Sequence, residues 1–352
     1  MTEQAYREHS ISDAEGWRRR LTVYQRPNDW RSLFELAATV LPLGLCWLSM
    51  LIALQFQVYW LYAFLLFPAA GFLVRLFMIQ HDCGHGAFFG SATANHWVGR
   101  LAGVLTLTPY DHWRRTHAIH HATSGNLDRR GTGDIKTLTS GEYRARSAWG
   151  RLSYRLYRHP AVMFGLGPAY VFFLENRLPV GSMRKGWMPW VSTTSTNLGI
   201  AAGVALTIWA FDVQTLLMTY VATALIAAAA GVWLFFVQHQ FDPAHWVRDK
   251  QWSAGEAALG SSYYALPAPL GWLTGNIGVH HVHHLSSRIP CYRLSEVLRD
   301  YPSLRELNRI NLAQSLSCPR LALWDEARRR LISFKDVEAG MARGLGFDTA
   351  VK

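Results

Sequence analysis

Apolar residues in this chain gather into four long runs instead of spreading evenly. The runs occupy residues 33–54, 58–79, 191–211 and 216–237, and each is close to the roughly 20 residues that a helix needs to cross a bilayer. Polar connectors of a few residues join the first run to the second and the third to the fourth. One such run could be a buried core helix. Two closely spaced pairs predict an all-α integral membrane protein with four transmembrane helices in two hairpins.

The placement of charge predicts the orientation of these helices. Charged residues make up only 17% of the chain, yet the formal net charge is +11. The connectors 55–57 and 212–215 contain no Lys or Arg, so the positive-inside rule places both termini and the segment between the hairpins in the cytoplasm. Basic flanks facing anionic lipid headgroups explain the high charge without a nucleic-acid partner. Arg75, near the end of the second run, is expected to extend towards the interface.

The chain is predicted to divide into a cytoplasmic arm (1–32), a membrane domain (33–295) and a cytoplasmic C-terminal tail (296–352). Two shorter apolar stretches, 98–109 and 161–174, are too short or too interrupted by Gly and Pro to span. They are expected to be interfacial or re-entrant helices. Because residues 98–109 do not cross the membrane, the segments before and after them lie on one side and can share a site.

Three histidine clusters follow the hydrophobic runs. One has the spacing H-x-x-x-H and two have H-x-x-H-H, which on a helix places the imidazoles on one face. Imidazole suits iron, zinc, copper and nickel, and eight such nitrogens exceed the four that one tetrahedral zinc takes. The sequence therefore predicts two metals in a cytoplasmic helical cap, bound by His81, His85, His117, His120, His121, His280, His283 and His284.

His239 is a candidate ninth ligand. It follows the fourth run by two residues, as His81 follows the second, so two helices that extend past the bilayer would bring both imidazoles to the same depth. His281 lies about 100° round the helix from His280 and should point away. The other histidines lack the cluster spacing and are expected at the surface or in hydrogen bonds: His9, His96, His112, His159 and His245.

Other groups near the clusters are harder to assign from sequence. The four cysteines are scattered and predict no disulfide framework, and Cys83 is expected to be a buried thiol and not a ligand. Five carboxylates or amides could orient the imidazoles from behind, although any single one is better explained by loop structure: Asp82, Asp111, Asn126, Asp128 and Asp134.

Two metals held by neutral imidazoles at a membrane favour a redox-active metal that binds oxygen over a hydrolytic zinc. A metal transporter is a remote alternative, because transport predicts ligands inside the bilayer at broken spans and no predicted span contains a histidine. A membrane zinc hydrolase is equally remote.

The three histidine boxes and their order between the hydrophobic pairs resemble the membrane fatty acid desaturase and hydroxylase superfamily, over residues 35–295. The sequences at 81–85, 113–117 and 275–280 resemble the acyl-lipid (Δ12/ω-type) group, which introduces a second, methyl-directed double bond. The resemblance implies an oxidoreductase that uses O2, two external electrons and two iron ions (Fe2+/Fe3+) to introduce a C=C bond. It implies an acyl-lipid or acyl-thioester substrate, a separate donor of the ferredoxin or cytochrome b5 type, and a bacterial inner membrane as the location.

The resemblance further implies that His239 and the eight box histidines bind the irons. In stearoyl-CoA desaturases, an asparagine one turn before the isolated histidine supports an iron through water. Phe235 occupies that position here, so Asn276, four residues before His280, is a possible water-mediated substitute, and Asp82 a possible support for a ligand. A lipid, alkane or carotenoid hydroxylase or ketolase of the same superfamily would carry identical histidines and stays an alternative.

Overall fold

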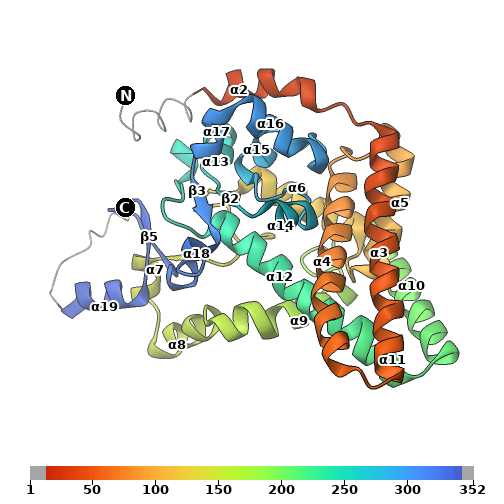
Figure 1. The fold of residues 1–352 in the computed structure, drawn as a ribbon. Helices are drawn as coiled ribbons and strands as arrows, with labels where there is room; N and C mark the ends of the chain where they lie inside the picture. The colour runs from red at the N-terminus through yellow and green to blue at the C-terminus, as the bar shows by residue number, and fades with distance from the viewer. Residues whose placement is uncertain (1–12, 343–352) are drawn as a thin grey trace.

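The computed structural model describes residues 13–342. Among these residues, four helical segments are long and apolar enough to cross a membrane, and they form two hairpins (Figure 1). The predicted membrane fold is therefore confirmed. The segments are α3 (Asp29–Gln55), α4 (Tyr59–Gly84), α10 (Met188–Ala210) and Val213–His239, the last comprising α11 (Val213–Leu216), a π-helical turn (Leu217–Val221) and α12 (Ala222–His239).

Two of the long helices continue beyond their apolar runs. α4 passes residue 79 and ends at Gly84, and α12 passes residue 237 and ends at His239. His81 and His239 therefore lie in the last turns of continuous helices, as expected. The helix geometry, and not a flexible loop, fixes their direction and depth.

The other helices lie before, between and after the hairpins. The α-helices are α2 (Ala14–Leu21), α5 (Ala92–Leu105), α6 (Tyr110–Thr123), α7 (Ser140–Arg144), α8 (Ala148–Tyr157), α9 (Gly167–Phe173), α13 (Ala254–Leu259), α14 (Ala268–Leu273), α15 (His280–Leu285), α16 (Leu294–Asp300), α17 (Pro302–Glu306), α18 (Leu312–Ser315) and α19 (Phe334–Ala342). A π-helical turn (Val162–Leu166) precedes α9, and 3-10 turns occupy Thr22–Tyr24, Glu175–Arg177, Asp249–Gln251, Cys291–Arg293 and Cys318–Arg320. Figure 1 shows α2, α6 and α13 to α17 gathered at one end of the hairpins, and we call this part the cap.

Two small sheets join the C-terminal segment to the rest of the chain. β2 (Tyr263–Ala265) pairs in parallel with β3 (Arg309–Asn311). β4 (Leu323–Asp325) lies between β1 (Leu138–Thr139) and β5 (Arg330–Ile332). Since both sheets cross the boundary predicted at residue 296, the described residues after it pack into the fold and do not form a separate tail.

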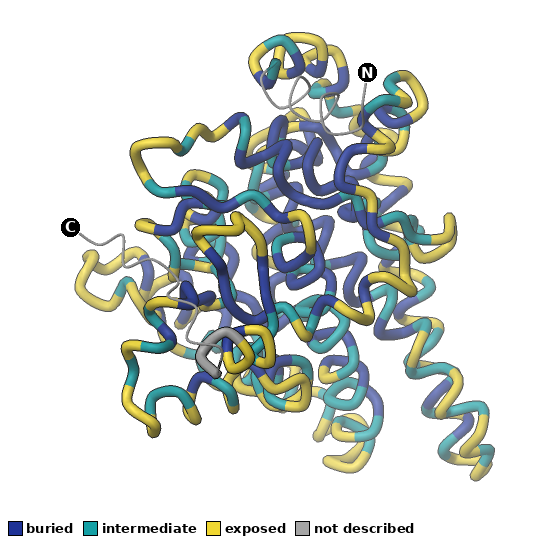
Figure 2. Tube along the Cα trace, turned by 90° about the vertical axis from the view of Figure 1, so that its left-hand side faces the viewer, coloured by how far each residue is buried: buried dark blue, intermediate teal, exposed yellow. Residues whose placement is uncertain are grey.

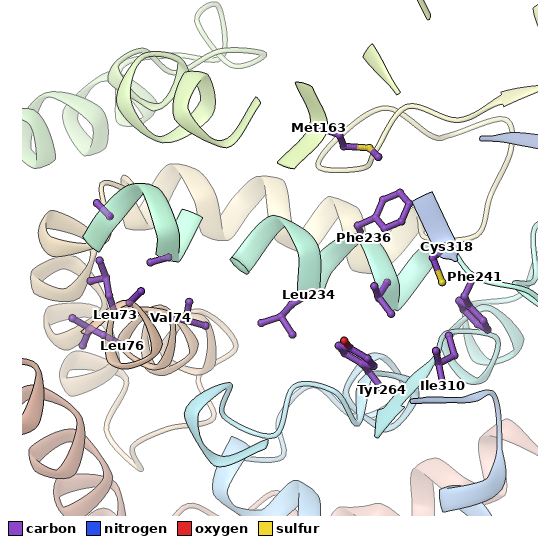
Figure 3. Close-up of a cluster of buried hydrophobic side chains, with 14 of the residues drawn as sticks. Leu73, Val74, Leu76, Met163, Leu234, Phe236, Phe241, Tyr264, Ile310 and Cys318 are labelled. Carbon is purple, nitrogen blue, oxygen red and sulfur yellow. The ribbon is translucent and has the colours of Figure 1, made fainter. Parts of the chain in front are cut away.

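The core lies where α12 meets α4 and the cap. Leu234 and Phe236 of α12 pack in one cluster with Leu73 of α4 and with Tyr264 (Figure 3). Figure 2 shows the buried segments concentrated in and near the cap, whereas the projecting helices carry exposed positions along their length. Apolar side chains such as that of Trp209 are exposed on these helices, which is the arrangement that a hydrocarbon environment accommodates.

A buried ion pair joins the two helices of the first hairpin. Glu35 of α3 and Arg75 of α4 are 1% and 2% exposed and form a salt bridge. Arg75 also donates to Thr39 Oγ1 (3.1 Å) and to the carbonyl of Trp272, and its guanidinium lies 3.8 Å from the centre of the Trp272 ring. The expectation that Arg75 extends towards the interface is therefore wrong, because Glu35 supplies a partner that the sequence pattern did not reveal.

We predict that Glu35→Leu alone lowers the free energy of unfolding by about 3–5 kcal/mol, because it leaves the Arg75 charge buried without a partner. The double variant Glu35→Leu/Arg75→Met should recover most of that loss. Unfolding in detergent would measure both. The half-exposed pair Arg100–Asp111 is the control, where removing one partner should cost less than about 1 kcal/mol. Additive losses at Glu35 and Arg75 would contradict the prediction.

Candidate metal centre

The structure brings all nine predicted histidines together in two groups. The potential ligand atoms within each group lie within 4.8 Å of one another. The five-histidine group takes its members from the end of α4, from α6 and from α15: His81, His85, His117, His121 and His283. The four-histidine group adds the last residue of α12: His120, His239, His280 and His284.

The helical spacing explains how α6 and α15 serve both groups. His117 and His121 are four residues apart and face the first group, whereas His120, between them, faces the second. On α15, His283 faces the first group and His284 the second. The rings of His121 and His284 stack across the boundary with centroids 4.1 Å apart. The two groups therefore form one continuous centre.

The imidazole nitrogens approach one another as metal ligands do. His117 Nε2 lies 3.1 Å from Nε2 of both His85 and His121, and His280 Nε2 lies 2.9 Å from His239 Nε2. In the four-histidine group, the buried Nε2 atoms of His120 and His284 have no hydrogen-bond partner among the described residues. Converging nitrogen lone pairs without protons to share fit two bound cations, so the residues present suit a pair of metals.

The surroundings favour neutral imidazoles. Burial, followed by repulsion from neighbouring imidazoles, lowers the pKa of His85, His117 and His283 well below 6.5. The pKa values of His121, His280 and His284 are lowered for the same reasons. A neutral imidazole is the form that binds a metal, so the protein needs no proton release from these residues to accept one at neutral pH.

Two carboxylates orient imidazoles by contacting Nδ1, the ring nitrogen that does not face the other histidines. Asp82 Oδ1 lies 3.2 Å from His81 Nδ1, while its other oxygen accepts the backbone N–H of Cys291 at 2.6 Å. Asp134 Oδ1 lies 2.5 Å from His120 Nδ1. Because a carboxylate only accepts, the proton sits on Nδ1 and the Nε2 lone pair is free for a metal. Sequence reasoning named Asp134 among five possible groups but did not single it out.

The other acidic and amide candidates have different partners. Asp111 pairs with Arg100. Asp128 pairs with Arg248, and the amide of Asn126 donates to Asp249. The Asn276 amide donates to the carbonyl of Cys291 at 3.2 Å, so its water-mediated role stays a prediction.

Aromatic rings close the sides of the centre. Trp113 stacks on His117 with centroids 4.6 Å apart and an angle of 14°. The Phe235 ring lies 5.1 Å from the rings of both His120 and His239. The apolar ring of Phe235 therefore occupies the position one turn before His239 where an asparagine could support a metal through water. The sequence did not reveal that this ring contacts both imidazoles.

The remaining histidines stay outside the two groups. His281 is fully buried and its Nε2 donates to the carbonyl of Leu304 at 2.9 Å, away from the centre as predicted, and burial lowers its pKa to about 4. His96 lies beside the Tyr110 hydroxyl and His159 caps a turn. His112 is buried, which the sequence did not indicate. His9 lies outside the described residues. Cys83 is buried in an apolar cluster and is in neither group.

An apolar cavity of about 280 Å³ adjoins the centre. His81, His117, His120 and His280 form part of its wall. Most of the rest comes from α4, α6, α9, α12, the end of α5 and the loop between α5 and α6, and includes Leu73, Phe77, Leu105, Phe172, Ala224 and Gly231. The lining on α12 extends from Ala224 to Gln238, which corresponds to roughly 21 Å along the helix axis. The predicted apolar stretches 98–109 and 161–174 both contribute to this wall.

These features define a helical membrane protein with a histidine-rich centre suited to two metals at the end of an apolar cavity. The fatty acid desaturase family model matches residues 58–311, and the chain belongs to that family. It is similar to a "Fatty acid desaturase" of Bacillus subtilis, with 44% identity over 91% of this chain and 90% of the relative. An "sn-1 acyl-lipid omega-3 desaturase (ferredoxin)" of Synechocystis is 33% identical over 62% of this chain and 61% of its own length. One from Nostoc is 29% identical over 76% and 74%.

We predict that His284→Ala lowers the bound metal by about half, because the four-histidine group would keep only three imidazoles. His281→Ala is the matched control on the same helix. It should retain the metal and lose about 1–3 kcal/mol of stability, because the Leu304 carbonyl loses its donor. Elemental analysis of purified protein and thermal unfolding would check both. Equal metal loss in the two variants would contradict the assignment.

Proposed function

We propose that this protein is a membrane-bound acyl-lipid desaturase that introduces a C=C bond into an acyl chain at a di-iron centre. The observation that carries the proposal is the convergence of nine imidazoles at the wall of an apolar cavity. The five-histidine group would hold one iron and the four-histidine group the other. A redox-active metal bound only by imidazole nitrogens next to an apolar cavity suits the oxidation of an unactivated carbon chain better than it suits hydrolysis.

The protein's own residues would bind, orient and shield the substrate. An acyl chain would lie between α4 and α12, with Phe77 and Phe172 packing against it. Trp113 and Phe235 would exclude water from the sides of the centre. Asp82 and Asp134 would hold His81 and His120 in one orientation. Precise placement of one C–C bond against the metals is the main contribution that the chain can make.

The reaction balances as loss of two hydrogen atoms from adjacent methylene groups. Together with two external electrons and two protons, these hydrogens reduce one O2 to two waters. The irons would supply the O2-dependent cleavage of the strong C–H bonds. The electrons would come from a separate carrier, and a ferredoxin-type donor is favoured because two relatives carry "ferredoxin" in their names. By the charge asymmetry, the cap would face the cytoplasm of a bacterial inner membrane.

The structure also bears on the alternatives. The grouped histidines lie at or beyond the ends of the long helices and not within a broken span, which disfavours a transport pathway. A hydroxylase would use the same histidines and the same cavity. Only the fate of the oxygen atoms distinguishes it from a desaturase.

We expect wild-type protein supplied with a reduced ferredoxin system, O2 and a monounsaturated acyl lipid to form a diunsaturated lipid. Under isotopically heavy O2, mass spectrometry should show the loss of two hydrogens and no heavy oxygen in the lipid. A product that retains heavy oxygen would establish the hydroxylase alternative. The His284→Ala variant serves as the negative control.

We predict that Gly231→Leu discriminates against long acyl chains. Gly231 lines the cavity, and an added Cβ there would meet no protein atom within 4 Å. The new side chain would therefore occupy space meant for substrate and not disturb packing. Forcing a long acyl chain against the added Leu side chain should cost about 1–3 kcal/mol, as overpacking of an apolar core does, which corresponds to roughly a 5- to 150-fold lower rate for the long chain. The ratio of rates for a long and a short acyl chain would measure the effect.

Gly203→Leu is the matched control. Gly203 lies on α10, is exposed, and likewise has no atom within 4 Å of an added Cβ, but it does not line the cavity. The chain-length ratio of this variant should equal that of the wild type. An unchanged ratio in Gly231→Leu would show that the acyl chain lies elsewhere.

A further inference from the structure

A buried arginine at the end of α8 has no acidic partner. Arg158 is 2% exposed, and within residues 13–342 it forms no ion pair. Its guanidinium donates only to neutral acceptors: the Leu321 carbonyl at 2.8 Å, Gln240 Oε1 at 3.1 Å, Thr137 Oγ1 at 3.3 Å and the Lys136 carbonyl at 3.4 Å. A buried charge without a carboxylate is costly. The planar fork of donors can, however, fix several chain segments at once.

Two of the segments that this arginine contacts support the four-histidine group. Gln240 directly follows His239 and caps the end of α12. Thr137 lies three residues after the aspartate that contacts Nδ1 of His120. The side-chain amide of Gln240 also donates to Thr137 Oγ1 at 2.9 Å, so the two segments are joined to each other as well as to Arg158. One guanidinium therefore connects the neighbours of two imidazoles in the same group.

The ring of His239 has little direct support of its own. Its Nδ1 lies 3.4 Å from Ser124 Oγ, near the limit of a hydrogen bond, and no carboxylate of the described residues contacts it. A cavity of about 10 Å³ lies beside this ring and is also bordered by Asp134 and Gln240. Side chains next to a void are not fixed by close packing alone. The direction of this imidazole therefore depends on how the neighbouring segments are held.

Two tyrosines of α8 hold one of these segments to the helix. Tyr154 Oη accepts the N–H of Leu138 at 3.1 Å, and Tyr157 Oη accepts the N–H of Lys136 at 3.0 Å. Arg158 extends this attachment to α12, because it bonds Gln240 and its guanidinium lies 5.6 Å from the centre of the Phe236 ring. α8 is thus connected to both sides of the four-histidine group.

We propose that Arg158 is a positioning residue for the four-histidine group. Its guanidinium holds the end of α12 and the segment after Asp134 at a fixed separation, so that His239 and His120 point at one metal. The inference rests on the two-metal centre of the proposed function, and it gives one half of that centre a support that lies outside the ligands. An effect on one half and not on the other distinguishes positioning from general stability.

The test exposes purified, iron-loaded protein to increasing EDTA and measures the remaining iron by elemental analysis. In Arg158→Met, one of the two irons should be released at an EDTA concentration about 10- to 100-fold lower than in the wild type, which is the usual effect of losing a support behind a ligand. The other iron should be released within about twofold of the wild-type concentration.

Arg177→Met is the matched control. Arg177 also donates to neutral acceptors, Asn197 Oδ1 and the Leu107 carbonyl, but contacts neither segment beside the four-histidine group. This variant should unfold at a lower temperature than the wild type and yet release both irons at the wild-type EDTA concentration.

Double variants identify the iron that is affected. Adding Arg158→Met to His284→Ala should release no further iron, because both changes act on the four-histidine group. Adding it to His85→Ala should weaken both irons, because His85 belongs to the other group. Gln240→Leu leaves Arg158 in place and should weaken the same iron, so it tests the proposal even if Arg158→Met does not fold. Gln240→Glu keeps an acceptor for the guanidinium and should retain both irons.

Each other outcome is decisive. If Arg158→Met releases both irons together, in step with its loss of thermal stability, the residue has a structural role only and the proposal is overturned. Arg158→Met and Gln240→Leu proteins that keep both irons as the wild type does would also overturn it. A wild-type protein that binds a single iron refutes both the two-metal centre and this inference. If the variants behave as expected but the wild type desaturates no acyl lipid, the proposed function fails and the role of Arg158 stands.

Discussion

The convergence of nine imidazoles is the constraint on which the rest of this structure depends. The ends of α4 and α12 and the helices α6 and α15 must lie at the same level relative to the long helices for these side chains to meet. α4 and α12 meet this requirement by continuing past their apolar runs, so that rigid helices carry His81 and His239 into the cap. α6 and α15 meet it with the spacing i, i+3, i+4, which divides neighbouring histidines between the two groups. Burying so many titratable groups is costly unless cations bind them, so metal binding and folding should be coupled.

The cap stabilises this arrangement through contacts far apart in the sequence. Asp82 connects the end of α4 to the segment after α15 through the N–H of Cys291. Arg75 connects α3 and α4 to Trp272, shortly before the third histidine box. The parallel pairing of β2 with β3 connects the segment before α15 to the C-terminal part of the chain. Each contact limits the freedom of a segment that carries ligands, which is how a site of this precision is maintained.

Local periodicity predicted most of the fold and of the candidate site. Apolar run length predicted the long helices, and histidine spacing predicted the eight box residues, the outward direction of His281 and the proximity of His239. The sequence could not predict partners that depend on tertiary contacts. It did not show that Glu35 neutralises Arg75, that Asp134 among five candidates reaches His120, or that Phe235 contacts two imidazoles. The sequence also did not reveal the strands after residue 295, because they are only three residues long, too short for a period of two to be visible.

The division between a rigid centre and an adaptable cavity suggests how one fold can serve different acyl substrates. Most of the histidines and their carboxylate partners occupy helix ends that several contacts hold in place, so changes there would disturb both histidine groups. The cavity wall on α12 instead uses Ala224, Ala227, Ala228 and Gly231, which lie on one face of the helix. Small residues on a helix can be enlarged without changing its backbone, as Gly231 illustrates. With the acyl chain bound as proposed, single substitutions along α12 would change the preferred substrate length while the histidine groups at its end stay the same.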